Sequence, residues 1–313
     1  MARAQGSRAQ ALLAFESAYG TAPASGYLKV PFASAGIGAA QPLLDSELLG
    51  NGRDPFAPVK DAIDVDGDMV VPVCAVSMGY WLKGLLGAPT TTGASAPYTH
   101  TFVSGAATLP SMALEIGHPD VPFYSMYSGV KANMLTINMQ RKGLITATVG
   151  LIAQGETTAT SSAAGSPTAT VLQRFGSFNG SVQRNGSDLG NIVSANLAYS
   201  NTLDRVEVLR DDGKIEGLDE GVATLGGQLV ARFDGAALYN QAVDGSSCSL
   251  SFSYEISAGV KLTFTAHEVY LPIPKKEVQG PAGVQVTFDW QASKATSPAR
   301  MMTAVLTNSV AAY

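Results

Sequence analysis

Alternation of apolar and polar residues predicts β-strands along most of the chain. Residues 64–74 (DVDGDMVVPVC) form one expected strand, in which Pro72 marks a sheet edge or a bulge. Residues 109–116 alternate between a face of methionine, leucine and isoleucine and a face of smaller or polar side chains. Residues 131–140 and 144–153 alternate in the same way, and the Arg-Lys-Gly between them predicts the tip of a β-hairpin.

The C-terminal half gives a similar series of strands. We expect strands at 220–233 and 249–256, and a closing pair formed by 259–270 and 284–292. Residues 249–256 alternate with period two, which predicts a strand with one buried face.

Two segments depart from this period and predict short helices. Residues 74–86 place their large apolar side chains on one helical stripe, and Gly87 and Pro89 end that helix. Residues 234–243 (DGAALYNQAV) predict the second helix, with Asp234 as its N-cap.

The order of elements repeats on either side of a segment without large apolar side chains. Residues 109–116 (LPSMALEI) align with 249–256 (SLSFSYEI), and Gly-Val-Lys occurs at both 129–131 and 259–261. This agreement predicts a duplication. We therefore expect a first domain at 1–156, a linker at 157–170 and a second domain at 171–313.

Composition favours strands and self-contact over catalysis. Hydrophobic residues make up 46% of the 313 residues and charged residues only 14%. A surface with so little charge is typical of one that meets copies of itself. The net charge of −5 and the lack of a basic stripe exclude a tight nucleic-acid binder.

The motifs that could carry chemistry are incomplete. Asp64, Asp66 and Asp68 alternate like the start of a calcium loop, but the later positions lack the required glycine and glutamate. The three histidines are dispersed, and Cys74 and Cys248 are expected to be buried thiols. No nucleophile with a base and no carboxylate pair is found, so we predict no catalytic, metal or cofactor residues and no enzymatic activity.

The chain shows no targeting or membrane segment. Two arginines precede an apolar run at 11–15, which is shorter than a signal-peptide core. No stretch approaches the roughly 20 apolar residues of a membrane span. We expect synthesis and folding in the cytosol, without a membrane partner.

An ordered series of short motifs gives the chain a family resemblance. It resembles the major tail tube (tail shaft) proteins of long-tailed, non-contractile-type bacteriophages and prophages, most closely over residues 10–156. The motifs are FESAYGT at 15–21, DSELLGNGRDP at 45–55, VDGD at 65–68, GYWLKGLLGAP at 79–89, YTHTF at 98–102, LPS at 109–111 and the segment 144–155.

The resemblance implies a mainly β fold built from tandem tail-tube β-sandwich or barrel domains, each with a short flanking helix. Hairpins of neighbouring subunits would form an inter-subunit β-barrel. Rings of such subunits would stack into the tail tube of the virion, the conduit for DNA ejection. Relatives typically form hexameric rings, so two domains per chain predict a trimeric ring with pseudo-sixfold symmetry, with a hexameric ring as the alternative.

The implied partners are other copies of the chain, the tape-measure protein and tail-end proteins, with transient passage of double-stranded DNA. A conduit for DNA should have a neutral or acidic wall, and the basic tip at Arg141 and Lys142 should lie outside it or at an interface. A capsid decoration protein or a host-binding adhesin is the alternative function.

A long stretch punctuated by Gly and Pro predicts a contact between rings. Residues 31–60 are too many for an ordinary connection and have no regular period. The alternative is a loop that folds back on its own domain. The expected contact residues are apolar or charged: Asp45, Glu47, Leu48, Leu49, Arg53, Asp54 and Phe56.

Overall fold

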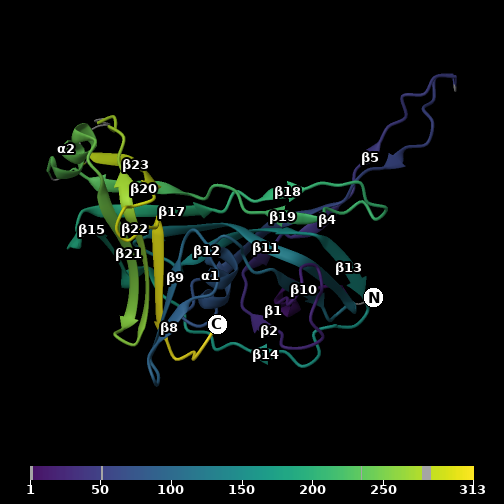
Figure 1. Cartoon of the computed structure of the whole chain (residues 1–313), viewed down its shortest axis with the longest axis horizontal. Coiled ribbons are helices and arrows are strands. Elements are labelled where there is room, and N and C mark those ends of the chain that lie inside the picture. The colour runs from purple at the N-terminus through teal and green to yellow at the C-terminus, as the bar shows by residue number, and fades with distance from the viewer. Residues whose placement is uncertain (1–2, 51, 234, 277–282) are drawn as a thin grey trace.

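The computed structural model describes residues 3–50, 52–233, 235–276 and 283–313 and is mainly β. A broad sheet crosses the molecule, and a thin arm projects from one end of it (Figure 1). The described part of the chain forms no closed barrel by itself, and its arrangement is consistent with β-sandwich tail tube domains.

The first half consists of strands that precede and follow one α-helix. The strands up to that helix are β1 (Gln10–Phe15), β2 (Leu28–Val30), β3 (Ser34–Ala35), β4 (Gly38–Ala40), β5 (Leu43–Leu44), β6 (Val59–Lys60) and β7 (Asp64–Pro72). The helix is α1 (Met78–Leu86). It is followed by β8 (Thr90–Thr92), β9 (Tyr98–Val103), β10 (Met112–His118), β11 (Phe123–Gln140), β12 (Thr146–Ala153) and β13 (Gly155–Ala159).

The second half is built in a similar way. Its strands before the helix are β14 (Thr168–Ala169), β15 (Gly180–Arg184), β16 (Ser187–Asp188), β17 (Ile192–Ser200), β18 (Asp204–Val206), β19 (Gly217–Asp219) and β20 (Thr224–Arg232). Then come α2 (Ala237–Asp244), β21 (Cys248–Ser257), β22 (Val260–Tyr270), β23 (Gln285–Ser293) and β24 (Met302–Asn308).

One antiparallel sheet runs through both halves without a break. Its strands pair in the order β7–β12–β11–β17–β20–β23, and the pairing of β11 with β17 joins the two halves. One face of this sheet packs on the core through residues such as Met69, Val149, Leu135, Tyr199 and Leu225, which are cross-strand neighbours. The other face is mostly polar or small, with Val70, Met134, Ile152 and Val230 among its side chains.

Two further sets of strands and the helix α1 cover the apolar face. The first set pairs in the order β2–β1–β10–β11–β13, and the second in the order β15–β21–β22–β24–β9–β8. Helix α1 buries Trp81, Leu82 and Leu85 and contacts β11 and β9. Gly87, with φ 93°, ends the helix as predicted, because glycine adopts this backbone conformation at little cost.

The same order of pairing occurs once in each half. In the first half the order is β3 and β4, then β7, β12 and β11; in the second it is β17, β20, β23 and β22. The registers agree as well. Ser34 pairs with Val70 as Ser194 pairs with Val230, and Ile37 is buried like its counterpart Leu197.

This correspondence corrects the alignment made from the sequence. Gly129 lies within β11, where its partner changes from β10 to β12, whereas Gly259 lies in the turn between β21 and β22. The Gly-Val-Lys at the two places is therefore a coincidence of short, β-rich sequences. The duplication and the domain boundaries at 156 and 171 stay predictions.

Three sequence predictions differ in detail from the structure. Residues 157–159, expected in the linker, belong to β13, which pairs with β11. The pair 259–270 and 284–292 is hydrogen-bonded only at its ends, since β22 pairs mainly with β21 and β24. Helix α1 begins at Met78 rather than at residue 74, and α2 begins at Ala237, while Asp234 lies outside the described residues.

Candidate functional site: the assembly surfaces

The polar face of the six-stranded sheet is its largest regular feature. Thr148, Thr136, Ala198, Gly226 and Gln291 lie side by side across five strands of this face. Because neighbours on one face of a sheet share a register, the small and neutral side chains form continuous rows.

A second row adds amide contacts to the polar face. Asn138, Asn196, Gln228 and Asp289 are successive neighbours on β11, β17, β20 and β23. Asn196 Nδ2 donates to Asn138 Oδ1 at 2.6 Å, and Gln228 Nε2 donates to Asp289 Oδ1 at 2.8 Å. These bonds link neighbouring side chains across the sheet.

The charge on this face is acidic. Exposed carboxylates lie at Asp64, Asp66, Asp68 and Asp289 on β7 and β23. Arg232 ends β20, and the remaining basic residue of the six strands, Lys131, is buried and paired with Glu220. Arg205 from β18 pairs with both Asp64 and Asp66, which neutralises one of the carboxylates.

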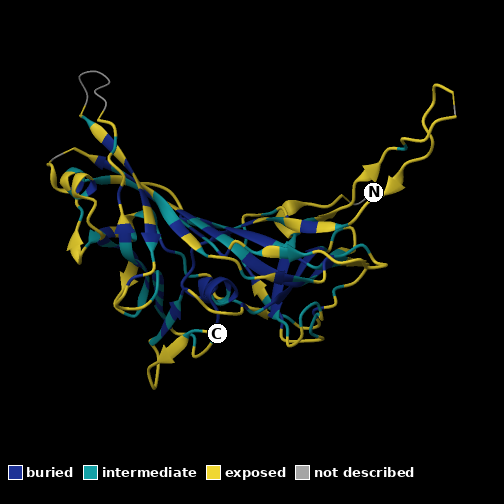
Figure 2. Cartoon of the chain, turned by 45° about the horizontal axis from the view of Figure 1, so that its top comes forward, coloured by how far each residue is buried: buried dark blue, intermediate teal, exposed yellow. Residues whose placement is uncertain are grey.

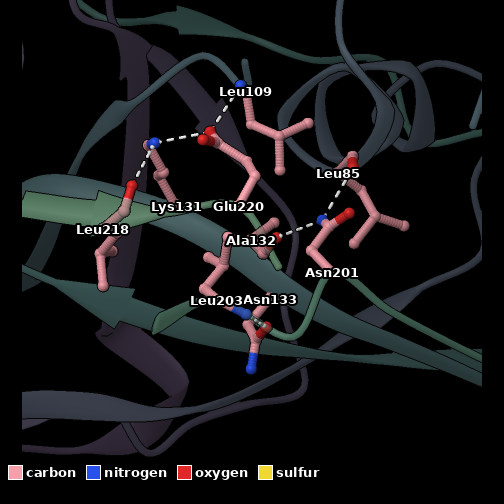
Figure 3. Close-up of polar contacts among 9 residues, drawn as sticks. All are labelled: Leu85, Leu109, Lys131, Ala132, Asn133, Asn201, Leu203, Leu218 and Glu220. Atoms are coloured by element: carbon pink, nitrogen blue, oxygen red, sulfur yellow. Dashed lines mark hydrogen bonds and ion pairs between the residues drawn. The ribbon is translucent and has the colours of Figure 1, made fainter. Parts of the chain in front are cut away.

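A partly buried ion pair joins the two halves (Figure 3). We call this ion pair and the amide contacts beside it the seam. Lys131 Nζ lies 2.7 Å from Glu220 Oε1 and donates to Leu218 O at 2.8 Å. Leu109 N–H donates to the same carboxylate at 2.8 Å. Burial alone would raise the pKa of Glu220, but these hydrogen bonds and the Lys131 charge outweigh it and lower that pKa.

Asn201 connects the seam to helix α1 by hydrogen bonds. Its Nδ2 donates to Leu85 O, at the end of α1, and to Ala132 O on β11, both at 2.9 Å. Asn133 Oδ1 accepts the N–H of Leu203 at 2.9 Å (Figure 3). A side chain of the second half therefore satisfies two backbone carbonyls of the first.

Replacing Asn201 with leucine should lower the free energy of unfolding by about 2–4 kcal/mol, because two buried carbonyls lose their donors. Asn196→Ala is the matched control: it removes an amide pair from the polar face, where water replaces the bond, and should cost less than about 1 kcal/mol. Chemical denaturation of both variants measures the difference. Equal losses would contradict a structural role for the seam.

The projecting arm comprises residues 43–50 and 52–60, from β5 to β6. All seven predicted contact residues lie on it and are exposed: Asp45, Glu47, Leu48, Leu49, Arg53, Asp54 and Phe56. Leu49 is 96% exposed, Leu48 74% and Phe56 40%. The arm extends away from the body rather than folding back on it, and nearly all of it is exposed (Figure 2). Residues 34–40, which we expected in the arm, instead form the sheet edge β3–β4.

The other motifs have structural roles. His100 is buried, with its ring nitrogens bonded to Thr91 Oγ1 and Val310 O at 2.8 and 2.9 Å. Cys74 and Cys248 are both buried free thiols, as predicted. Within the described ranges, no group of three or more His, Cys, Asp or Glu side chains could hold a metal ion.

Sequence reasoning missed the seam. Glu220 and Lys131 are 89 residues apart in the chain, and neither lies in a recognisable motif. The one available signal was a lysine in a strand without other charged residues, because a buried lysine requires a partner.

Comparison with protein families identifies the family to which the chain belongs. The family described as phage tail tube protein matches residues 6–292. The chain belongs to that family. Among curated proteins, none matches the chain in sequence.

The tail tube family is a family of structural phage tail proteins, and the family resemblance noted in the sequence is confirmed. No helix in the described ranges has the length and apolar character needed to cross a membrane.

Proposed function

We propose that this chain is the repeating subunit of a phage tail tube in the virion, synthesised in the host cytoplasm. Copies join edge to edge through the six-stranded sheet into rings, and the rings stack into a conduit for DNA ejection. The observation that carries this proposal is a continuous sheet with one packed face and one open, polar face. Barrel closure removes the open edges that such a sheet otherwise exposes.

The polar face fits the wall of a DNA conduit. Double-stranded DNA carries about one negative charge per 1.7 Å of its axis, so basic side chains would bind it and slow its passage. Rows of Thr, Asn and Gln with several carboxylates offer no such binding. The basic hairpin tip at Arg141 and Lys142 lies at the end of the sheet, which supports a place at an interface between rings.

The repeated pairing order supports a ring of three chains. Each chain carries the four-strand order twice, so three chains supply six similar units and a pseudo-sixfold ring. A ring of six chains is the alternative. The tape-measure protein would fill the tube before ejection, and tail-end proteins would cap it.

Electron microscopy of the purified protein tests this function. We expect hollow tubes, and a reconstruction with three chains per ring whose polar face lines the channel. Six chains per ring would overturn the trimer, whereas discrete oligomers or fibres under all conditions would overturn the tube and favour a decoration protein or an adhesin. A channel lined by Arg and Lys would contradict the role of the polar face.

A further inference from the structure

The joint between the two halves provides a template for a joint between copies. It pairs the last strand of the first unit, β11, with the first strand of the second unit, β17, from Met134 opposite Ser200 to Gln140 opposite Ser194. The two remaining ends of the series, β3–β4 and the chain after β22, have no such partner within the described residues.

The β3–β4 edge has outward backbone groups that side chains satisfy. Ile37 O accepts a hydrogen bond from Tyr127 Oη at 3.0 Å, and Ala39 N–H donates to Glu156 Oε2 at 2.9 Å. The counterparts of these two residues, Leu197 and Tyr199, lie opposite Ile137 and Leu135 of β11. Side chains thus occupy the positions that a strand occupies in the second unit.

The other end is the segment 271–276 (LPIPKK) after β22. Pairing of β22 with β23 stops at Tyr270 opposite Gln291, and Pro272 and Pro274 follow, which cannot donate backbone hydrogen bonds. Such prolines are typical of edge strands. Ile273 is 60% exposed in this segment.

Opposite charges lie at the two ends. Lys275 and Lys276 close the segment 271–276, whereas Glu156 and Asp68 lie beside the β3–β4 edge. This difference favours pairing of one end with the other over pairing of like ends. A contact between unlike surfaces closes into a ring when its rotation allows.

The registers predict which residues meet. Gly38, Asp66, Ile152 and Lys131 are successive neighbours across the first unit. Ala198, Gly226, Gln291 and Tyr270 are the corresponding neighbours in the second. At the internal joint, Met134 lies opposite Ser200. Met134 is three residues after Lys131, and Ser200 is two residues after Ala198. The same spacing places Ile273 opposite Ala40.

From this correspondence we infer that residues 271–276 of one copy pair antiparallel with β3–β4 of the next, with Ile273 opposite Ala40. This inference rests on the proposed function and specifies its ring joint. The neighbour's backbone replaces the Glu156 carboxylate at Ala39 N–H. Glu156 and Tyr127 therefore cap the edge in a free chain, which limits pairing with other proteins before assembly.

Cysteine cross-linking tests the joint. In assembled tubes of the Ala40→Cys, Ile273→Cys variant, a mild oxidant should link copies into covalent trimers, because directly opposite Cβ atoms are about 4.5–5.5 Å apart. The control, Ala40→Cys with Lys276→Cys, places the thiols three residues out of register, about 10 Å apart, and should not cross-link. Tubes without cross-links, or equal cross-linking in both variants, would overturn the joint but not the tube.

Hydrogen exchange of the wild-type protein tests the same joint without cysteines. The amide of Lys276 should exchange at least about tenfold more slowly in tubes than in free chains, because the proposed register places Lys276 opposite Ile37, whose carbonyl faces the joint. Unchanged exchange would overturn the joint. Failure of the wild-type protein to form rings or tubes at all would instead overturn the proposed function.

Discussion

Replacing Leu48 and Phe56 with serine and Arg53 with glutamate should leave folded rings that no longer stack into tubes. In the free chain the two apolar side chains extend into solvent on the arm. Burial against a neighbouring ring would stabilise the contact by roughly 1.5–3 kcal/mol for each side chain. Because every chain of a ring contributes an arm, the loss is multiplied around the ring.

Negative-stain microscopy and light scattering separate the outcomes of the arm variant. The control is Val171→Ser with Val222→Ser, which also removes exposed apolar side chains but lies outside the arm. The control should form tubes of normal length. Tubes of normal length from the arm variant itself would show that the arm does not join rings.

The sequence predicts those strands whose two faces differ most. The segments that became β7, β11 and β12 were found because one face must pack on the core while the other carries Asp, Thr and Asn. The strand β17 shows the same alternation, with Ala195, Leu197 and Tyr199 buried, and could have been found in the same way.

Pairing between distant strands could not be predicted, since a local pattern specifies a strand but not its partner. Nothing in β24 points to β9, yet Val305 lies opposite Thr101. For the same reason the ion pair of the seam was not predicted. The short motif Gly-Val-Lys likewise gave a wrong alignment of the two halves.

The arm was predicted because its composition conflicts with packing in its own domain. Glycines and prolines break any regular period there, while leucines and a phenylalanine remain. The structure shows the projection and its exposed side chains. That the arm contacts another ring is a proposal, because a single chain contains no such neighbour.

Glu220→Gln should destabilise the chain by about 3 kcal/mol, the second large effect that we expect. The Lys131 ammonium is largely buried, and the substitution leaves its charge without a carboxylate. Glu255→Gln is the matched control, because Glu255 and Lys261 form an ion pair with both side chains about half exposed. Exposed pairs of this kind contribute at most about 1 kcal/mol.

The pH dependence of unfolding separates the seam charge from a packing defect. The folded pKa of Glu220 lies below its usual value of 4.5, so its carboxylate stabilises the fold above that pH and loses this effect as the pH falls through the folded pKa. The wild-type protein should therefore lose more stability than Glu220→Gln between about pH 5 and 3, and the two denaturation curves should converge. If the stabilities of the two proteins changed in parallel across this pH range, the ion pair would not stabilise the junction of the halves. The pairing of β11 with β17 at this junction makes the sheet continuous.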